Sequence, residues 1–154
     1  MKSILLSIIA SCAMTYVYAN TTPYTTDLSG IWTTVNDSTG LSQADVIMIK
    51  NDDGSYTGKI LSVRPISSST LTDFCTKCKG DLKDQPFVGL EILSNISPDP
   101  NQNFEFKGAK LLNLQSGNIN TAKAKLNSRG NRLSLIEFSK SSPLGRSETW
   151  IRKN

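Results

Sequence analysis

The 154-residue chain contains no histidine. Catalytic groups that pair serine or cysteine with histidine are therefore excluded. Three cysteines without histidine are too few for a structural zinc site, which takes four such ligands. Paired carboxylates for hydrolysis do not stand out, because Asp52 and Asp53 lie in a turn and the other acids are dispersed. We therefore expect a protein that is not an enzyme and holds no metal or cofactor.

Long apolar runs are also scarce. A bilayer core requires about 20 consecutive apolar residues, and the run Ile4–Ala10 is much shorter, so no stable membrane span is expected. Lys2 precedes this run and Val17-Tyr18-Ala19 follows it, which is the arrangement of an export signal. We predict that residues 1–19 form a signal peptide and that the mature protein is periplasmic or secreted.

A second interpretation of this segment is a lipoprotein signal. Ile9-Ala10-Ser11-Cys12 resembles a lipoprotein acceptor, in which Cys12 would become the lipidated first residue. That signal would be short for engaging the export machinery, so cleavage after Ala19 is favoured.

Clustered positive charge is missing as well. The chain carries a net charge of +4, but its lysines are scattered along the sequence. Nucleic-acid binding needs basic residues gathered on one face. No nucleic-acid partner is expected.

The chain is rich in short segments of alternating polar and apolar residues. Their spacing, with turn signals about every 8–12 residues, is typical of an antiparallel all-β domain. The candidate strands are Gly30–Val35, Ala44–Lys50, Tyr56–Val63, Gln85–Ile96, Phe104–Lys107, Ala109–Leu114, Ile119–Leu126, Arg132–Phe138 and Arg146–Arg152. Asn51–Gly54 has the composition of a hairpin turn, and Leu71–Cys78 is consistent with a short helical turn.

These segments predict an up-and-down β-barrel of about eight strands over residues 28–154, after a polar leader at 20–27. Eight strands make a barrel wide enough to be filled by side chains or to hold one small ligand. Trp32 on the first strand and Arg152 on the last would close it. An arginine stacked on an indole adds roughly 0.5–2 kcal/mol.

Cys75 and Cys78 remain after removal of the signal. In an oxidising compartment such a pair forms a disulfide, which here would staple the long loop between strands. The alternative is a redox-active Cys-x-x-Cys motif with a thiolate stabilised by nearby lysines. That chemistry needs a βαβ setting, and the pattern here is all-β.

Several motifs in order resemble one family. They are Gly30-Ile31-Trp32, Asn36–Gly40, Gly58-Lys59-Ile60, Cys75–Gly80, Lys83–Leu90, Leu144-Gly145-Arg146 and Thr149–Arg152. Together they resemble the family of exported bacterial proteins called DUF2147. The resemblance implies a lipocalin-like barrel whose biochemical role is unassigned.

Polar residues near strand ends are candidate ligand contacts. Asn36 and Asp37 follow the first strand, where they could orient a ligand or simply form the turn. Arg64 and Arg146 could neutralise a ligand's carboxylate headgroup. By the period of two, Arg146 shares one face of its strand with Glu148, Trp150 and Arg152.

The function we expect is binding of a small, partly apolar molecule in the periplasm. Two alternatives remain open at this point. One is an envelope protein–protein interaction module with a filled barrel and the loop Arg64–Lys83 as its recognition element. The other is a thiol oxidoreductase that uses Cys75 and Cys78.

Overall fold

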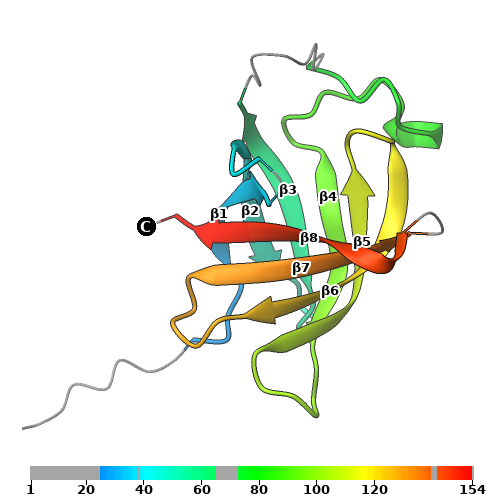
Figure 1. Ribbon diagram of the computed structural model, residues 1–154. Coiled ribbons are helices and arrows are strands. Elements are labelled where there is room, and N and C mark those ends of the chain that lie inside the picture. Colours follow the sequence, from blue (N-terminus) through cyan, green and yellow to red (C-terminus); the bar gives the residue numbers. More distant parts are fainter. Residues whose placement is uncertain (1–24, 38, 65–72, 140–141, 154) are drawn as a thin grey trace, which may run out of the picture.

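Eight antiparallel strands form a closed barrel in the computed structural model, which describes residues 25–37, 39–64, 73–139 and 142–153 (Figure 1). The strands are β1 (Gly30–Asn36), β2 (Ser42–Lys50), β3 (Tyr56–Val63), β4 (Glu91–Pro98), β5 (Glu105–Asn113), β6 (Asn118–Leu126), β7 (Arg132–Ser139) and β8 (Ser142–Arg152). Each strand pairs with the next along the chain, and β8 pairs with β1. The predicted up-and-down barrel is confirmed.

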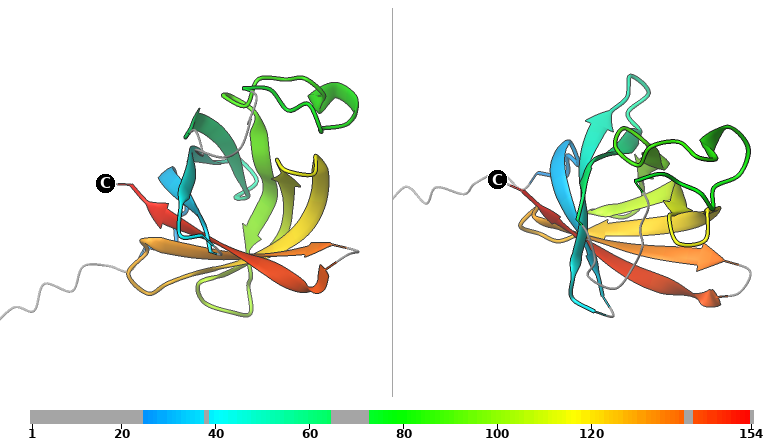
Figure 2. Two further views of the ribbon diagram at one scale, coloured as in Figure 1. Left: turned by 45° about the horizontal axis from the view of Figure 1, so that its top comes forward. Right: turned by 90° about the horizontal axis from the view of Figure 1, so that it is seen from above.

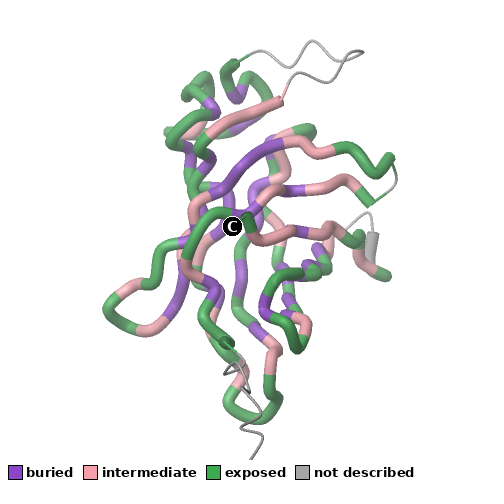
Figure 3. Tube along the Cα trace, turned by 90° about the vertical axis from the view of Figure 1, so that its left-hand side faces the viewer, coloured by how far each residue is buried: buried purple, intermediate pink, exposed green. Residues whose placement is uncertain are grey.

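Residues that alternate between apolar and polar along the sequence face the interior and the outer surface of the barrel in turn. On β2, Val46 and Met48 are buried in the interior, whereas Ile49 is exposed on the outer surface. Buried and exposed positions alternate in the same way along β3, β6 and β7, whereas β4 and β5 each contain two adjacent buried residues (Figure 3). The turn at Asn51–Gly54 is formed as expected, with the Gly54 N–H donating to the Asn51 carbonyl over 3.0 Å.

Two predicted boundaries in the middle of the chain are wrong. Residues 85–90 do not extend β4; they form a loop in which Pro86 makes an isolated bridge with Phe74. Residues 73–78 are not helical, and the one short helix within the described ranges is the single 3-10 turn η1 (Gly80–Leu82). The backbone of residues 85–90 bonds to Asp73 and Cys75 in the loop and to Ile60 on β3 without forming a continuous ladder, so this segment is not a strand.

The two short strands expected on either side of Gly108 are a single strand. The register of β5 against β6 shifts between Phe106 and Ala109, so a bulge absorbs the irregularity without breaking the strand. The last strand also begins earlier than predicted, at Ser142.

One end of the barrel is solid. Trp32 and Trp150 are fully buried there, together with Leu93, Leu133 and Leu135. The Trp32 indole N–H donates to the Leu28 carbonyl over 2.8 Å, which draws the segment before β1 across this end. The opposite end carries the loop between β3 and β4, drawn in green in Figure 2.

The predicted signal peptide, Cys12 and most of the polar leader lie outside the described residues, as does the middle of the loop Arg64–Lys83. In the part of the chain that the structure describes, no helix combines the length and apolar character needed to cross a membrane.

Candidate functional site

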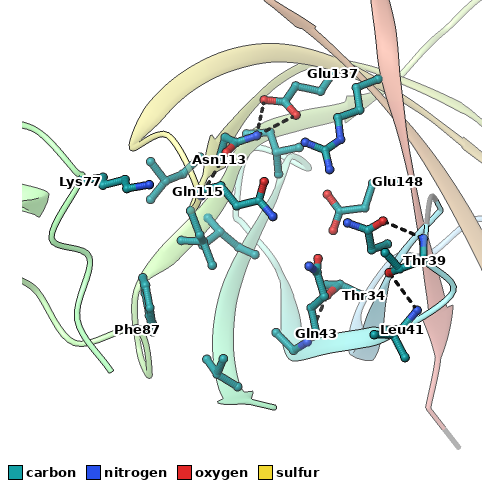
Figure 4. Close-up of a pocket in the computed structure, with 18 of the residues that line it drawn as sticks. Thr34, Thr39, Leu41, Gln43, Lys77, Phe87, Asn113, Gln115, Glu137 and Glu148 are labelled. Atoms are coloured by element: carbon teal, nitrogen blue, oxygen red, sulfur yellow. Dashed lines mark hydrogen bonds between the residues drawn. The ribbon is translucent and has the colours of Figure 1, made fainter. Parts of the chain in front are cut away.

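A cavity of about 620 Å³ occupies the end of the barrel opposite the Trp32 plug (Figure 4). Small-molecule sites in proteins typically measure about 300–1,000 Å³. The apolar part of its wall comes from β3, β4, β5 and the mouth loops, through Val63, Ile92, Leu111, Leu112, Leu114, Phe74 and Phe87. All the lining residues from β1, β7 and β8 are polar, and we call this side the polar wall. The side formed by β3–β5 carries the apolar residues named above and is called the apolar wall, although Asn113, Gln115 and Lys77 add polar groups there.

The loop that carries the two cysteines forms part of the mouth. Cys75 and Cys78 are joined by a disulfide and both are buried. The Cys75 N–H donates to the Gln85 carbonyl over 2.8 Å, and Thr76 and Lys77 line the cavity. Buried sulfurs in a loop without a following helix of useful length favour a structural staple over redox exchange, which needs an accessible thiolate.

The turn between β5 and β6 supports this loop. Gly117 packs so closely against it that an added Cβ would lie 1.8 Å from the Lys77 carbonyl oxygen. The side chain of Lys79 also donates to the Asn118 amide oxygen over 3.1 Å. The cysteine loop is thus held against the barrel from two sides.

Glu148 on β8 lies at the inner end of the polar wall. Strand register places it between Asn36 on β1 and Leu135 on β7, one inward position above the buried Trp150. The Trp150 indole N–H donates to Glu148 Oε1 over 3.0 Å. Figure 4 shows the carboxylate directed into the cavity.

Burial raises the pKa of the Glu148 carboxyl to about 7. The negative charges of Glu137 and Asp37 act in the same direction, while the Trp150 hydrogen bond and the Arg146 charge oppose it. This carboxyl therefore changes protonation in the neutral pH range, which is unusual for glutamate.

Glu137 on β7 is the second carboxylate of the cavity and is 7% exposed. The side-chain amides of Asn113 and Asn120 both donate to it, the former at 3.4 Å from each oxygen. Arg146 lies directly opposite Glu137 on β8, nearer the rim. It makes no ion pair within 4.0 Å with any residue in the described ranges.

Of the four predicted ligand contacts, the structure places two in the cavity wall. Asn36 and Arg146 line it, although Asn36 also organises its turn by accepting the Gly40 N–H at its carbonyl over 2.7 Å. Asp37 is exposed in that turn and does not line the cavity.

Arg64 requires a correction, because it lies outside the cavity and is bound by Asp45. Its Nη2 is 2.7 Å from Asp45 Oδ1, and Lys153 Nζ is 2.8 Å from Oδ2. Asp45 precedes a register shift on β2 and points outward, where these cations cover it. Burial alone would raise the pKa of Asp45, but hydrogen bonds from Lys153, Arg64 and Thr33 hold it well below its usual value.

Glu137 and Glu148 were not among the predicted ligand contacts. For Glu148 the sequence held a usable signal, since it shares a strand face with Trp150, which has to be buried in so small a barrel. Glu137 shares a strand face with Leu133 and Leu135, but Ile136 and Phe138 make the other face of β7 apolar as well, so the inward face was ambiguous. Among the described residues, no group of three or more Cys, Asp or Glu side chains is placed to hold a metal ion.

At the opposite, solid end, Trp32 and Arg152 are direct register partners on β1 and β8. Arg152 donates to three backbone carbonyls there, those of Asp27, Ser29 and Gly130. Arg152 therefore also binds the segment before β1 and the β6–β7 turn to the solid end of the barrel.

A closed eight-stranded barrel, plugged at one end and hollow at the other, defines a lipocalin-like protein. A solved structure has the same fold: protein HP1028 from Helicobacter pylori, described as belonging to the lipocalin family. The two match with a TM-score of 0.66 and 21% sequence identity, over 84% of this chain and 85% of that one.

The family itself is shown by the sequence match. Residues 30–152 match the model of the family described as "Uncharacterized protein conserved in bacteria (DUF2147)", and the chain belongs to this family. A search of curated proteins finds no match.

Proposed function

We propose that this protein is an exported, non-catalytic carrier or receptor that binds one small, partly apolar molecule inside the barrel. The observation that supports it is the cavity of about 620 Å³, with its apolar wall on β3–β5 and its polar wall on β1, β7 and β8. Burial of apolar ligand surface contributes roughly 25 cal/mol per Å² before the entropy cost of binding. The polar groups then orient the ligand.

The lipocalin-like fold is consistent with this role, as is the solid end. Because Trp32, Trp150 and the leucines around them already fill that half, binding there would require unpacking the core. A ligand that enters the open half needs no such rearrangement.

Export to the periplasm, with cleavage after Ala19, is part of the same proposal. The Cys75–Cys78 disulfide supports it, because disulfides persist in oxidising compartments. Cell fractionation and N-terminal sequencing test it. A mature chain that starts at Asn20 in the periplasmic fraction is the expected result, and a lipid-modified chain that starts at Cys12 would contradict it.

Native mass spectrometry of protein purified from its own source tests the binding function. We expect a mass excess of a few hundred daltons that disappears on denaturation. Protein that is free of ligand and fails to bind any apolar fluorescent probe would contradict the proposal.

One observation favours the second candidate, a protein-interaction module. Phe74 and Val88 expose half or more of their surface in the loops around the mouth, where a partner could cover them. Crosslinking in the periplasm distinguishes the two functions. A specific protein adduct lost in a Val88→Ser variant, which leaves the cavity lining intact, would support this candidate.

A further inference from the structure

We propose that the ligand is an amphipathic amine, whose ammonium group binds the Glu148 carboxylate while its apolar body lies against the β3–β5 wall. This inference rests on the proposed binding function and specifies the ligand class. It reverses the expectation that an arginine would receive a carboxylate headgroup.

The depth of the charged groups in the cavity is the first argument. Glu148 lies directly above Trp150, at the inner end of the polar wall, whereas Arg146 is one inward position closer to the rim and is exposed. Lys77 also lies at the mouth, on the cysteine loop. A molecule that enters the cavity meets the cations first and the carboxylate last.

The second argument is the unused bonding capacity of Glu148. An ionised carboxylate accepts about four hydrogen bonds, and the one that the structure assigns to Glu148 comes from the Trp150 indole. Glu137, by contrast, already accepts from the amides of Asn113 and Asn120. An ammonium group carries three donors and a positive charge, and charge-assisted hydrogen bonds are the stronger ones.

The third argument is what the site would reject. A ligand carboxylate at the cavity floor would face Glu148 and Glu137, and like charges placed together disfavour binding. Arg146 is the cation whose charge acts on Glu148, and it does not form an ion pair with it. A neutral alcohol would lose the charge-assisted bond but could still bury its chain.

The raised pKa of Glu148 then couples binding to pH. An alkylamine remains protonated throughout the neutral range, whereas Glu148 ionises at about 7. Since the ammonium binds the ionised form, the apparent affinity should rise about tenfold from pH 6 to pH 8 and then level off. The charges of Glu137, Arg146 and the more distant, exposed Asp37 act on this carboxyl, and Lys77 lies at the cavity mouth.

Isothermal titration with three chain-matched probes, octylamine, octanoate and 1-octanol, tests the inference. We expect the amine to bind roughly tenfold or more tightly than the alcohol at pH 8, and octanoate to bind most weakly. Glu148→Gln, which keeps an acceptor for Trp150, should remove the preference for the amine over octanol and the pH dependence of amine binding. The matched control is Glu91→Gln, since Glu91 is exposed on β4 and loses the same charge.

The outcomes separate this inference from the proposed function. Equal or tighter binding of octanoate, or an amine preference that survives in Glu148→Gln, would overturn the inference while the binding function stands. Failure of all three probes to bind or to displace an apolar fluorescent probe would count against both. A loss of octanol binding in Glu148→Gln would show that the variant disturbs the cavity; Glu148→Asp, which retains the charge, should then restore the amine preference, and its failure to do so would overturn the inference.

Discussion

The guanidinium of Arg152 lies over the indole ring of Trp32, with its central carbon 4.3 Å from the ring centroid. The two residues are direct partners in the β1–β8 ladder that closes the barrel. This pair therefore lies at the end of the ladder that joins the first strand to the last, and it covers the solid end.

Replacing Arg152 with alanine should destabilise the fold. The change removes the stack on Trp32 and three hydrogen bonds to backbone carbonyls, and we expect a loss of about 2–4 kcal/mol in the free energy of unfolding. Urea denaturation measures it. Arg132→Ala, at an exposed position on β7, serves as the control and should change stability by less than about 0.5 kcal/mol. Equal effects of the two substitutions would contradict a role for Arg152 in closure.

Gly117→Ala should loosen the mouth of the cavity. Gly117 has a φ of +70°, and its new Cβ would collide with the Lys77 carbonyl. Gly54→Ala is a matched control, because Gly54 has a φ of +81° with no atom within 4 Å of the added Cβ. The backbone strain of about 1 kcal/mol is common to both variants.

The additional collision at Gly117 should cost about 1–3 kcal/mol more and weaken ligand binding. Urea denaturation and probe binding measure the two effects. If both variants lose the same stability and both bind normally, the packing of the β5–β6 turn against the cysteine loop does not matter for the site.

Asp45 should make the fold sensitive to acid. Hydrogen bonds from Lys153, Arg64 and Thr33 overcome the effect of burial and lower its pKa in the folded state. Its contribution to stability is therefore complete above the unfolded pKa of about 4 and is lost as the pH falls further.

Asp45→Asn should reduce stability by about 1–3 kcal/mol at pH 7. Below about pH 4 the difference from the parent protein should shrink, because the unfolded parent then takes up a proton at Asp45 that the folded parent resists. Chemical denaturation at pH 7, 4 and 3 follows this convergence. A constant difference across these pH values would show that the ion pairs contribute nothing.

Glu148 should have the opposite pH dependence. Burial raises its folded pKa to about 7, so the folded protein holds a proton that the unfolded chain releases above about pH 4.5. Stability is therefore lost as the pH rises from about 4.5 to 7, and the loss levels off above that.

Glu148→Gln removes this cost, so the ligand-free variant should be more stable than the parent by about 1–3 kcal/mol at pH 8 and nearly equal to it at pH 4.5. Glu91→Gln, on the outer surface, should show no such trend. If the Glu148→Gln variant is less stable than the parent at pH 8, the buried carboxylate does not destabilise the folded state, which would contradict this prediction.

Most of the fold could be predicted from the sequence, because β-barrel strands are short, local and bounded by turns. Residues 85–90 were wrongly predicted to be part of a strand, because they alternate between polar and apolar positions. Their backbone is bonded mainly to the cysteine loop and does not form a continuous ladder. The single strand β5 was divided at Gly108 because a bulge and a turn have the same local signature. Both errors concern the pairing of backbone segments. Because pairing depends on the whole sheet, a short stretch of sequence does not reveal it.

The candidate site was less predictable. Arg64 follows an apolar strand, but which surface it reaches depends on the register shift beside Asp45, and no local pattern reveals that. Glu148 could have been assigned to the interior through Trp150. Glu137 was harder to assign, because apolar residues occupy both faces of β7 and the amides of Asn113 and Asn120 that bind its carboxylate come from other strands.

The solid end of the barrel also makes this protein a practical scaffold for engineering new binding sites. The tryptophans and leucines around the plug form the packed part of the core, so partly exposed lining residues such as Leu41, Gln43 and Gln115 can be randomised to select for new ligands. Selection at those positions would sample recognition chemistry while the base of the molecule keeps its shape.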